Sequence, residues 1–151
     1  MNKYKHLLEK FIKVKHRVKS LIDEYPPEKR EQILFDKWSL KDVIAHLNTW
    51  MEDDLRALKN LKGGKKSYWE PDIDAFNAKG VDIRKNRSWS VVYKEFDHLV
   101  SKLIETYETL PEELYEAQIW GKHKGTPMRS LQTGIEHWEE EHIPSLESNL
   151  K

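Results

Sequence analysis

The chain has 151 residues, with 26 Lys and Arg against 26 Asp and Glu, and it contains no cysteine. This length suits one domain, on a prior of roughly 100–200 residues per domain. The balanced charge argues against a nucleic acid or an anionic membrane as partner, and the lack of cysteine excludes disulfides and thiolate chemistry. No apolar run approaches the roughly 20 residues of a membrane span, and the charged N-terminus is unlike a signal peptide. We therefore expect one cytoplasmic domain over residues 1–151.

Apolar residues predict two long helices in the first half of the chain. In the first, from Lys3 to Glu24, they recur at steps of three and four, and lysine and glutamate occupy the face that we interpret as solvated. The double proline at residues 26–27 ends it. The second helix is predicted to start at Ser39, which can cap it together with Asp42, and to run to about residue 62, before two glycines.

Two further long helices are predicted in the second half. The third runs from about Ser88 to Leu110, and the fourth begins at Thr126, a capping residue followed by proline, and runs to about Asn149. Residues 63–87 form a long crossover that can contain a short helix after Pro71. No convincing strand is visible. The fold class is therefore all-α, a four-helix bundle with a long crossover between helices two and three, and such bundles build sites in their cores.

Polar side chains interrupt the apolar stripe of the second helix. At about 100° per residue, Asp54 lies close to Leu47 at the centre of the stripe, and His46 lies at its edge beside Trp50. A carboxylate on this face must open onto a cavity or be paired, because burying it alone costs too much free energy.

The fourth helix repeats this pattern. His142 lies near the centre of its stripe, whereas His137 and Glu141 point away by a quarter turn or more. Pro144 predicts a kink or a lost hydrogen bond just after His142. One histidine on an apolar face is usually a hydrogen-bonded core residue, but His46 and His142 on two helices of one bundle favour a shared site.

Two segments are similar to a known family. The segment WSLKDVIAHL at residues 38–47, followed by Trp50, resembles the signature of the DinB/YfiT-like four-helix proteins. The segment MRSLQTGIEHWEEEHIPSLE at residues 128–147 resembles their last helix. The ClbS/DfsB branch, which carries a tryptophan segment before that helix, is the most similar, with residues 119–121 in its place. The resemblance extends over nearly the whole chain and implies the same DinB-like fold.

The resemblance also implies a candidate metal site. Metal-binding members hold a divalent ion with one histidine on the second helix and two on the last helix, four residues apart. His46 and His142 match two of these positions, but the third is Trp138, which cannot coordinate a metal. This departure favours a site without a cofactor. A divalent metal ion is the alternative, with Asp53 or Asp54 as a further ligand.

The function that the resemblance implies concerns a small molecule. The ClbS branch is associated with self-resistance to a reactive genotoxin by hydrolysis, which implies binding and detoxification of a small electrophile. Of the six tryptophans, Trp50, Trp120 and Trp138 would wall the pocket, and the catalytic polar groups would be His46, Asp54 and His142. The alternatives are a metal-dependent transferase or hydrolase of the DinB type, a non-catalytic small-molecule binding protein, and a dimeric stress or scaffold protein. A homodimer is implied by the resemblance alone.

Overall fold

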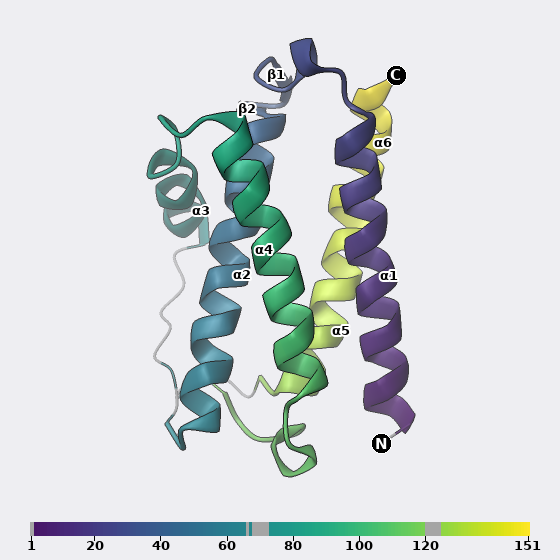
Figure 1. Cartoon of the computed structure of the whole chain (residues 1–151), viewed down its shortest axis with the longest axis vertical. Coiled ribbons are helices and arrows are strands. Elements are labelled where there is room, and N and C mark those ends of the chain that lie inside the picture. Colours follow the sequence, from purple (N-terminus) through teal and green to yellow (C-terminus); the bar gives the residue numbers. More distant parts are fainter. Residues whose placement is uncertain (1, 66, 68–72, 120–124) are drawn as a thin grey trace.

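Long amphipathic helices form the bundle in the computed structural model of the chain, which describes residues 2–65, 67, 73–119 and 125–151 (Figure 1). The bounds of the first three are α1 (Asn2–Glu24), α2 (Leu40–Lys62) and α4 (Trp89–Glu108). The fourth member of the bundle, here called the C-terminal rod, consists of three consecutive helical segments: α5 (Pro127–His137), the π-helical turn η3 (Trp138–His142) and α6 (Ile143–Leu150). The predicted all-α bundle is thus confirmed.

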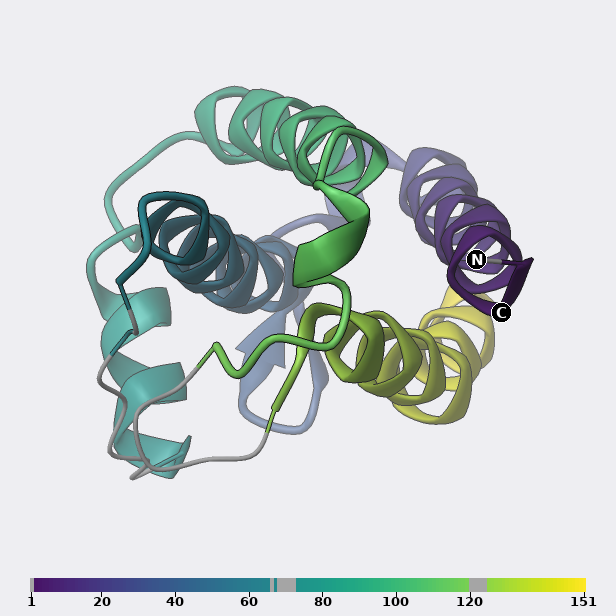
Figure 2. The same ribbon diagram turned by 90° about the horizontal axis from the view of Figure 1, so that it is seen from below.

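The helices pack in two neighbouring pairs, α1 beside the C-terminal rod and α2 beside α4 (Figure 2). Two buried tyrosines, one in α1 and one directly after it, hold this helix to the others. Tyr4 Oη donates to the Tyr107 carbonyl at 2.7 Å, and Tyr25 Oη donates to the Leu146 carbonyl at 2.5 Å. The core between the pairs is filled by the apolar stripes predicted from the sequence. No helix in the described part of the chain is long and apolar enough to cross a membrane.

The predicted helix starts are present in the structure. Ser39 and Asp42 form a reciprocal capping box, in which the Asp42 amide donates to Ser39 Oγ at 3.2 Å and the Ser39 amide donates to Asp42 Oδ2 at 3.0 Å. Thr126 caps α5 by accepting from the Arg129 amide, and Pro127 occupies the first turn. These local contacts fix where α2 and α5 begin.

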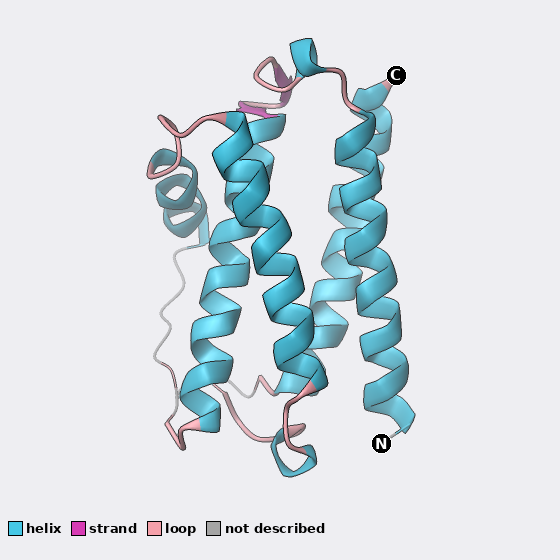
Figure 3. Cartoon of the chain, in the orientation of Figure 1, coloured by secondary structure: helices cyan, strands magenta, loops and turns pink. Residues whose placement is uncertain are grey.

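The expectation of no strands is wrong at one place. The short strands β1 (Ile33–Phe35) and β2 (Trp38–Ser39) pair antiparallel just before α2 (Figure 3). The turn between them places Asp36 in the left-handed region, with φ of 60°. A 3₁₀ turn, η1 (Pro27–Lys29), precedes them.

The crossover contains the short helix α3 (Ile73–Asp82), which packs against α2. Gly80 allows this close approach, because a Cβ atom there would lie 2.3 Å from Thr49 Oγ1. The buried Arg84 side chain then ties the end of the crossover to both neighbours, through Glu52 and Thr49 on α2 and Glu95 on α4. The crossover thus returns the chain to the end where α2 began, so α2 and α4 run in the same direction (Figure 1). A second 3₁₀ turn, η2 (Glu112–Leu114), follows α4.

Candidate metal centre

Three histidines from three elements come together where α2 lies beside the C-terminal rod. His46 comes from α2, His137 is the last residue of α5, and His142 is the last residue of η3. One ring nitrogen from each lies within 4.8 Å of the other two. The Nε2 atoms of His137 and His142 are 2.9 Å apart, and the rings of His46 and His142 are centred 5.4 Å apart. The predicted meeting of His46 and His142 is therefore present, and His137 joins it.

The π-turn explains why the sequence analysis missed His137. In η3 the amide of Ile143 donates to the carbonyl of Trp138, five residues earlier, so the turn contains one residue more than an α-helical turn. This wider turn brings residues five apart, His137 and His142, onto one face. His137 points away from the core, as predicted, and its side chain is 42% exposed, but its ring still reaches the cluster. Trp138 does not take the third position, since its side chain packs in the core and is 5% exposed.

Pro144 gives a physical reason for this turn. A proline ring clashes with the carbonyl four residues earlier, which here belongs to Glu140, and it provides no amide for that carbonyl. The structure accommodates both effects by widening the turn that contains Glu140. The kink predicted at Pro144 thus takes the form of a π-turn just before it, and π-turns of this kind are frequent at functional sites.

The three side chains fit a divalent transition metal. Burial lowers the pKa of His46 to about 4 and that of His142 to about 3, with neighbouring histidines as the next cause, so both imidazoles are neutral and able to coordinate at pH 7. The buried Nδ1 atom of His46 has no hydrogen-bond partner in the described part of the chain. His137 Nδ1 contacts Glu141 Oε2 at 3.1 Å, the carboxylate contact that commonly orients a ligating histidine. Three imidazoles leave coordination positions open for a substrate or water.

Acidification should destabilise the metal-free protein through His46. Its pKa is about 4 in the folded chain against about 6.5 for a free side chain, so between these values the unfolded chain binds a proton that the folded chain does not. The stability that neutral His46 contributes is complete above pH 6.5 and is lost as the pH falls toward 4. From pH 7 to pH 5 the loss amounts to about 2 kcal/mol.

Urea unfolding in EDTA at pH 7 and pH 5 measures this loss. The His46→Gln variant should lose about 2 kcal/mol less than the wild type over this interval. The matched control is His98→Gln, at an exposed position on α4, which should behave as the wild type. An identical pH dependence in the wild type and His46→Gln would contradict the assignment.

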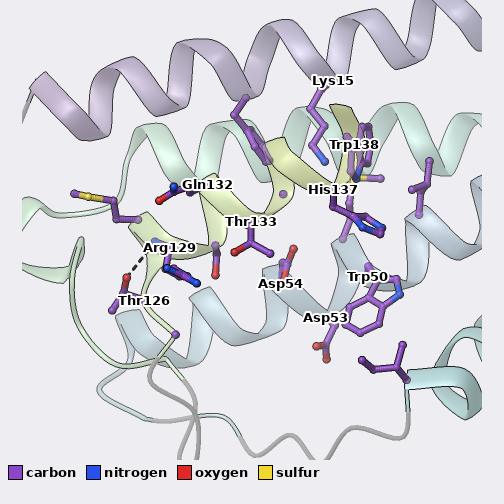
Figure 4. Close-up of a pocket in the computed structure, with 18 of the residues that line it drawn as sticks. Lys15, Trp50, Asp53, Asp54, Thr126, Arg129, Gln132, Thr133, His137 and Trp138 are labelled. Atoms are coloured by element: carbon purple, nitrogen blue, oxygen red, sulfur yellow. Dashed lines mark hydrogen bonds between the residues drawn. The ribbon is translucent and has the colours of Figure 1, made fainter. Parts of the chain in front are cut away.

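A pocket of about 930 Å³ opens beside the histidines (Figure 4). Its wall includes His46 and His137 and the two described tryptophans of the predicted pocket, Trp50 and Trp138. The α3 helix sets the position of Trp50, because Trp50 Nε1 donates to Asn77 Oδ1 at 2.6 Å and the indole packs on Phe76. Trp120, the third predicted tryptophan, lies outside the described residues.

Acidic side chains of α2 line the same pocket. Burial raises the pKa of Asp54 to about 7, so its carboxyl group can exchange a proton near neutral pH. Asp53 instead forms an ion pair with Arg56 at 2.7 Å. Asp54 is predicted from the sequence either to open onto a cavity or to be paired, and in the structure it lines the pocket.

Lys15 is a pocket residue that the sequence analysis assigned to the solvated face of the first helix. Its side chain is 3% exposed, and its Nζ atom lies 3.1 Å from the ring centroid of Trp138 and 4.6 Å from that of Phe11. Burial lowers the pKa of this ammonium to about 7, against the raising effect of Asp54. Its spacing was the available signal, because Lys15 stands four residues after Phe11 and three before Val18, both in the core.

Comparison with known proteins identifies the family. The family model described as the DinB superfamily matches residues 10–143, which includes all three histidines, Lys15 and Asp54. No curated protein and no solved structure matches the chain. Since the matched region is most of the chain, the protein belongs to the DinB superfamily.

Proposed function

We propose that this protein is a metal-dependent enzyme of the DinB type that adds water or a thiol to a small electrophile. The observation that carries the proposal is the cluster of His46, His137 and His142 at the wall of a pocket lined by tryptophan. Imidazole ligands suit zinc, nickel, copper and iron, and a set of three leaves room for a reacting group.

The residues of the chain have separate roles in this proposal. When bound, the metal supplies a Lewis acid that lowers the pKa of a nucleophile. The three imidazoles would hold it, and Glu141 would orient His137. The Asp54 carboxylate accepts a proton from the nucleophile, since its raised pKa suits a general base near neutral pH. Trp50 and Trp138 give the pocket its apolar wall.

The choice between a site with a metal and one without depends on the third ligand. The sequence argument for a site without a metal was that Trp138 occupied that position. In the folded chain His137 lies beside the other two histidines, which supports the metal-dependent alternative. The ClbS/DfsB branch, the homodimer and the cytoplasmic location stay predictions.

Metal titration and turnover test the proposal together. The chain, purified without an affinity tag and treated with EDTA, should bind one Ni²⁺ or Zn²⁺ ion by calorimetry, and the bound ion should raise the melting temperature by mass action. Styrene oxide, with and without a thiol, is the probe electrophile, and its diol or thioether product is followed by mass spectrometry.

The outcomes separate the alternatives. Turnover that requires the bound ion supports the proposal, and His98→Gln on α4 should leave it unchanged. Absence of metal binding at micromolar concentration would overturn the metal-dependent function. Metal binding without turnover of any epoxide, alkyl halide or activated alkene would favour the non-catalytic binding protein.

A further inference from the structure

The Lys15 ammonium has no acceptor in the described part of the chain. No hydrogen bond or ion pair to its Nζ atom is formed there, although the side chain is 3% exposed. Its contacts are with the faces of Trp138 and Phe11. An ammonium group has three donors, and Lys15 lines the pocket, where a bound group can reach them. A bound group with acceptor oxygens would satisfy these donors in a site that is largely shielded from water.

Lys15 is directed into the same pocket as the histidine cluster. In Figure 4 its side chain extends from α1 toward Trp138 and His137, and Asp54 extends from α2 on the other side. The positive charge of Lys15 contributes to the lowered pKa of His142, which places the ammonium within electrostatic reach of the candidate metal centre. A ligand in the pocket can therefore contact Lys15 and the centre together.

The balance of charge in the pocket favours an anionic ligand. Imidazole ligands do not compensate the charge of a divalent ion, and Lys15, whose pKa burial lowers to about 7, adds a positive charge when it is protonated. Asp54 offsets part of this charge, whereas the charge of Asp53 is already paired with Arg56. The exposed charged residues of the pocket lining are two cations, Lys3 and Arg129, and one acid, Glu116.

We propose that Lys15 is the binding residue for a carboxylate carried by the substrate. The substrate class is then a small electrophile with a carboxylate, which accepts hydrogen bonds from Lys15 Nζ while the reactive part faces the histidines. A charge-assisted hydrogen bond in a buried site is the contact that an ammonium without an acceptor is suited to make. The role of the histidines in this inference rests on the proposed function. The binding of a carboxylate by Lys15 does not, because Lys15 and the pocket are present in the metal-free chain.

Calorimetry with propionate and its neutral isostere propionamide tests the inference in both the Ni²⁺-loaded and the EDTA-treated protein. Propionate should bind at least about tenfold more tightly than propionamide in the wild type, from the strength of a hydrogen bond between charged groups. Lys15→Met should weaken propionate binding roughly 10- to 100-fold and leave propionamide binding unchanged. The matched control is Lys13→Met, at an exposed position on the same helix.

Two further measurements keep the result interpretable. Lys15→Met should fold with a melting temperature equal to or above that of the wild type, because methionine fills the site without a buried charge. It should also bind Ni²⁺ at least as tightly, since a positive charge near the ion is removed. Wild-type propionate affinity in Lys15→Met, or no preference for propionate over propionamide in the wild type, would overturn the inference. Failure to bind Ni²⁺ would overturn only the proposed function.

Discussion

Substitution of His137 by alanine is expected to lower the affinity of the chain for Ni²⁺ or Zn²⁺ by roughly 100- to 1000-fold. A structural zinc site with four ligands binds with about 10–16 kcal/mol, or roughly 3 kcal/mol for each ligand, which corresponds to this factor. The reason is geometric, because His137 Nε2 lies 2.9 Å from His142 Nε2 and all three ring nitrogens lie within 4.8 Å. Competition calorimetry against a chelator of known affinity measures the loss.

Two matched variants show whether this loss is specific to His137. Trp138→Phe changes the residue that a regular helix would place in the third position, and it should retain wild-type affinity. Glu141→Gln removes the acid that contacts His137 Nδ1, and it should cost no more than about tenfold, because that pair is exposed to solvent. Wild-type affinity in His137→Ala would show that the third ligand is another group.

The bundle was predictable because its signals are local and repeated. The capping box of Ser39 and Asp42 and the Thr126–Pro127 start are decided by contacts within one turn, and they hold in the structure. The paired strands were missed because each has only two or three residues, too few to show alternation. The residues that fix α3 were missed because Gly80 and Arg84 act through partners far away in the sequence.

The candidate site was predictable only where its helix is regular. A helical wheel at about 100° per residue placed His46 and Asp54 toward the site, because α2 is an uninterrupted α-helix. On the last helix the same wheel placed His142 toward the site but left out His137, because a hydrogen bond to the fifth residue back brings the two onto one face. The available signals were the five-residue spacing of His137 and His142 and the proline that follows. The burial of Lys15 was missed for another reason, since lysine is usually exposed to solvent, although the position of Lys15 in the helix indicated the core.

Deletion and insertion of one residue within η3 should have opposite effects on metal affinity: the deletion should preserve it and the insertion should abolish it. Deletion of Glu140 removes the extra residue of the π-turn and places the two histidines four residues apart, which a helical turn again brings onto one face. Pro144 still leaves the carbonyl four residues before it without an amide partner. The rest of α5 and α6 keeps its register, so metal affinity should stay within about tenfold of the wild type. Glu140 is the suitable residue, because its exposed side chain forms no ion pair in the described part of the chain, whereas Glu139 contacts Lys10 and Glu141 contacts His137.

Insertion of one alanine between Glu139 and Glu140 should instead abolish the site. The two histidines would then be six residues apart, and the added residue turns His142 by about 100° away from His137. The expected loss of metal affinity is again roughly 100- to 1000-fold, as for removal of a ligand. Circular dichroism and thermal unfolding of both variants establish that each is folded. Equal losses from deletion and insertion would show that the π-turn itself is needed for coordination, and unchanged affinity after insertion would show that His137 and His142 do not share an ion.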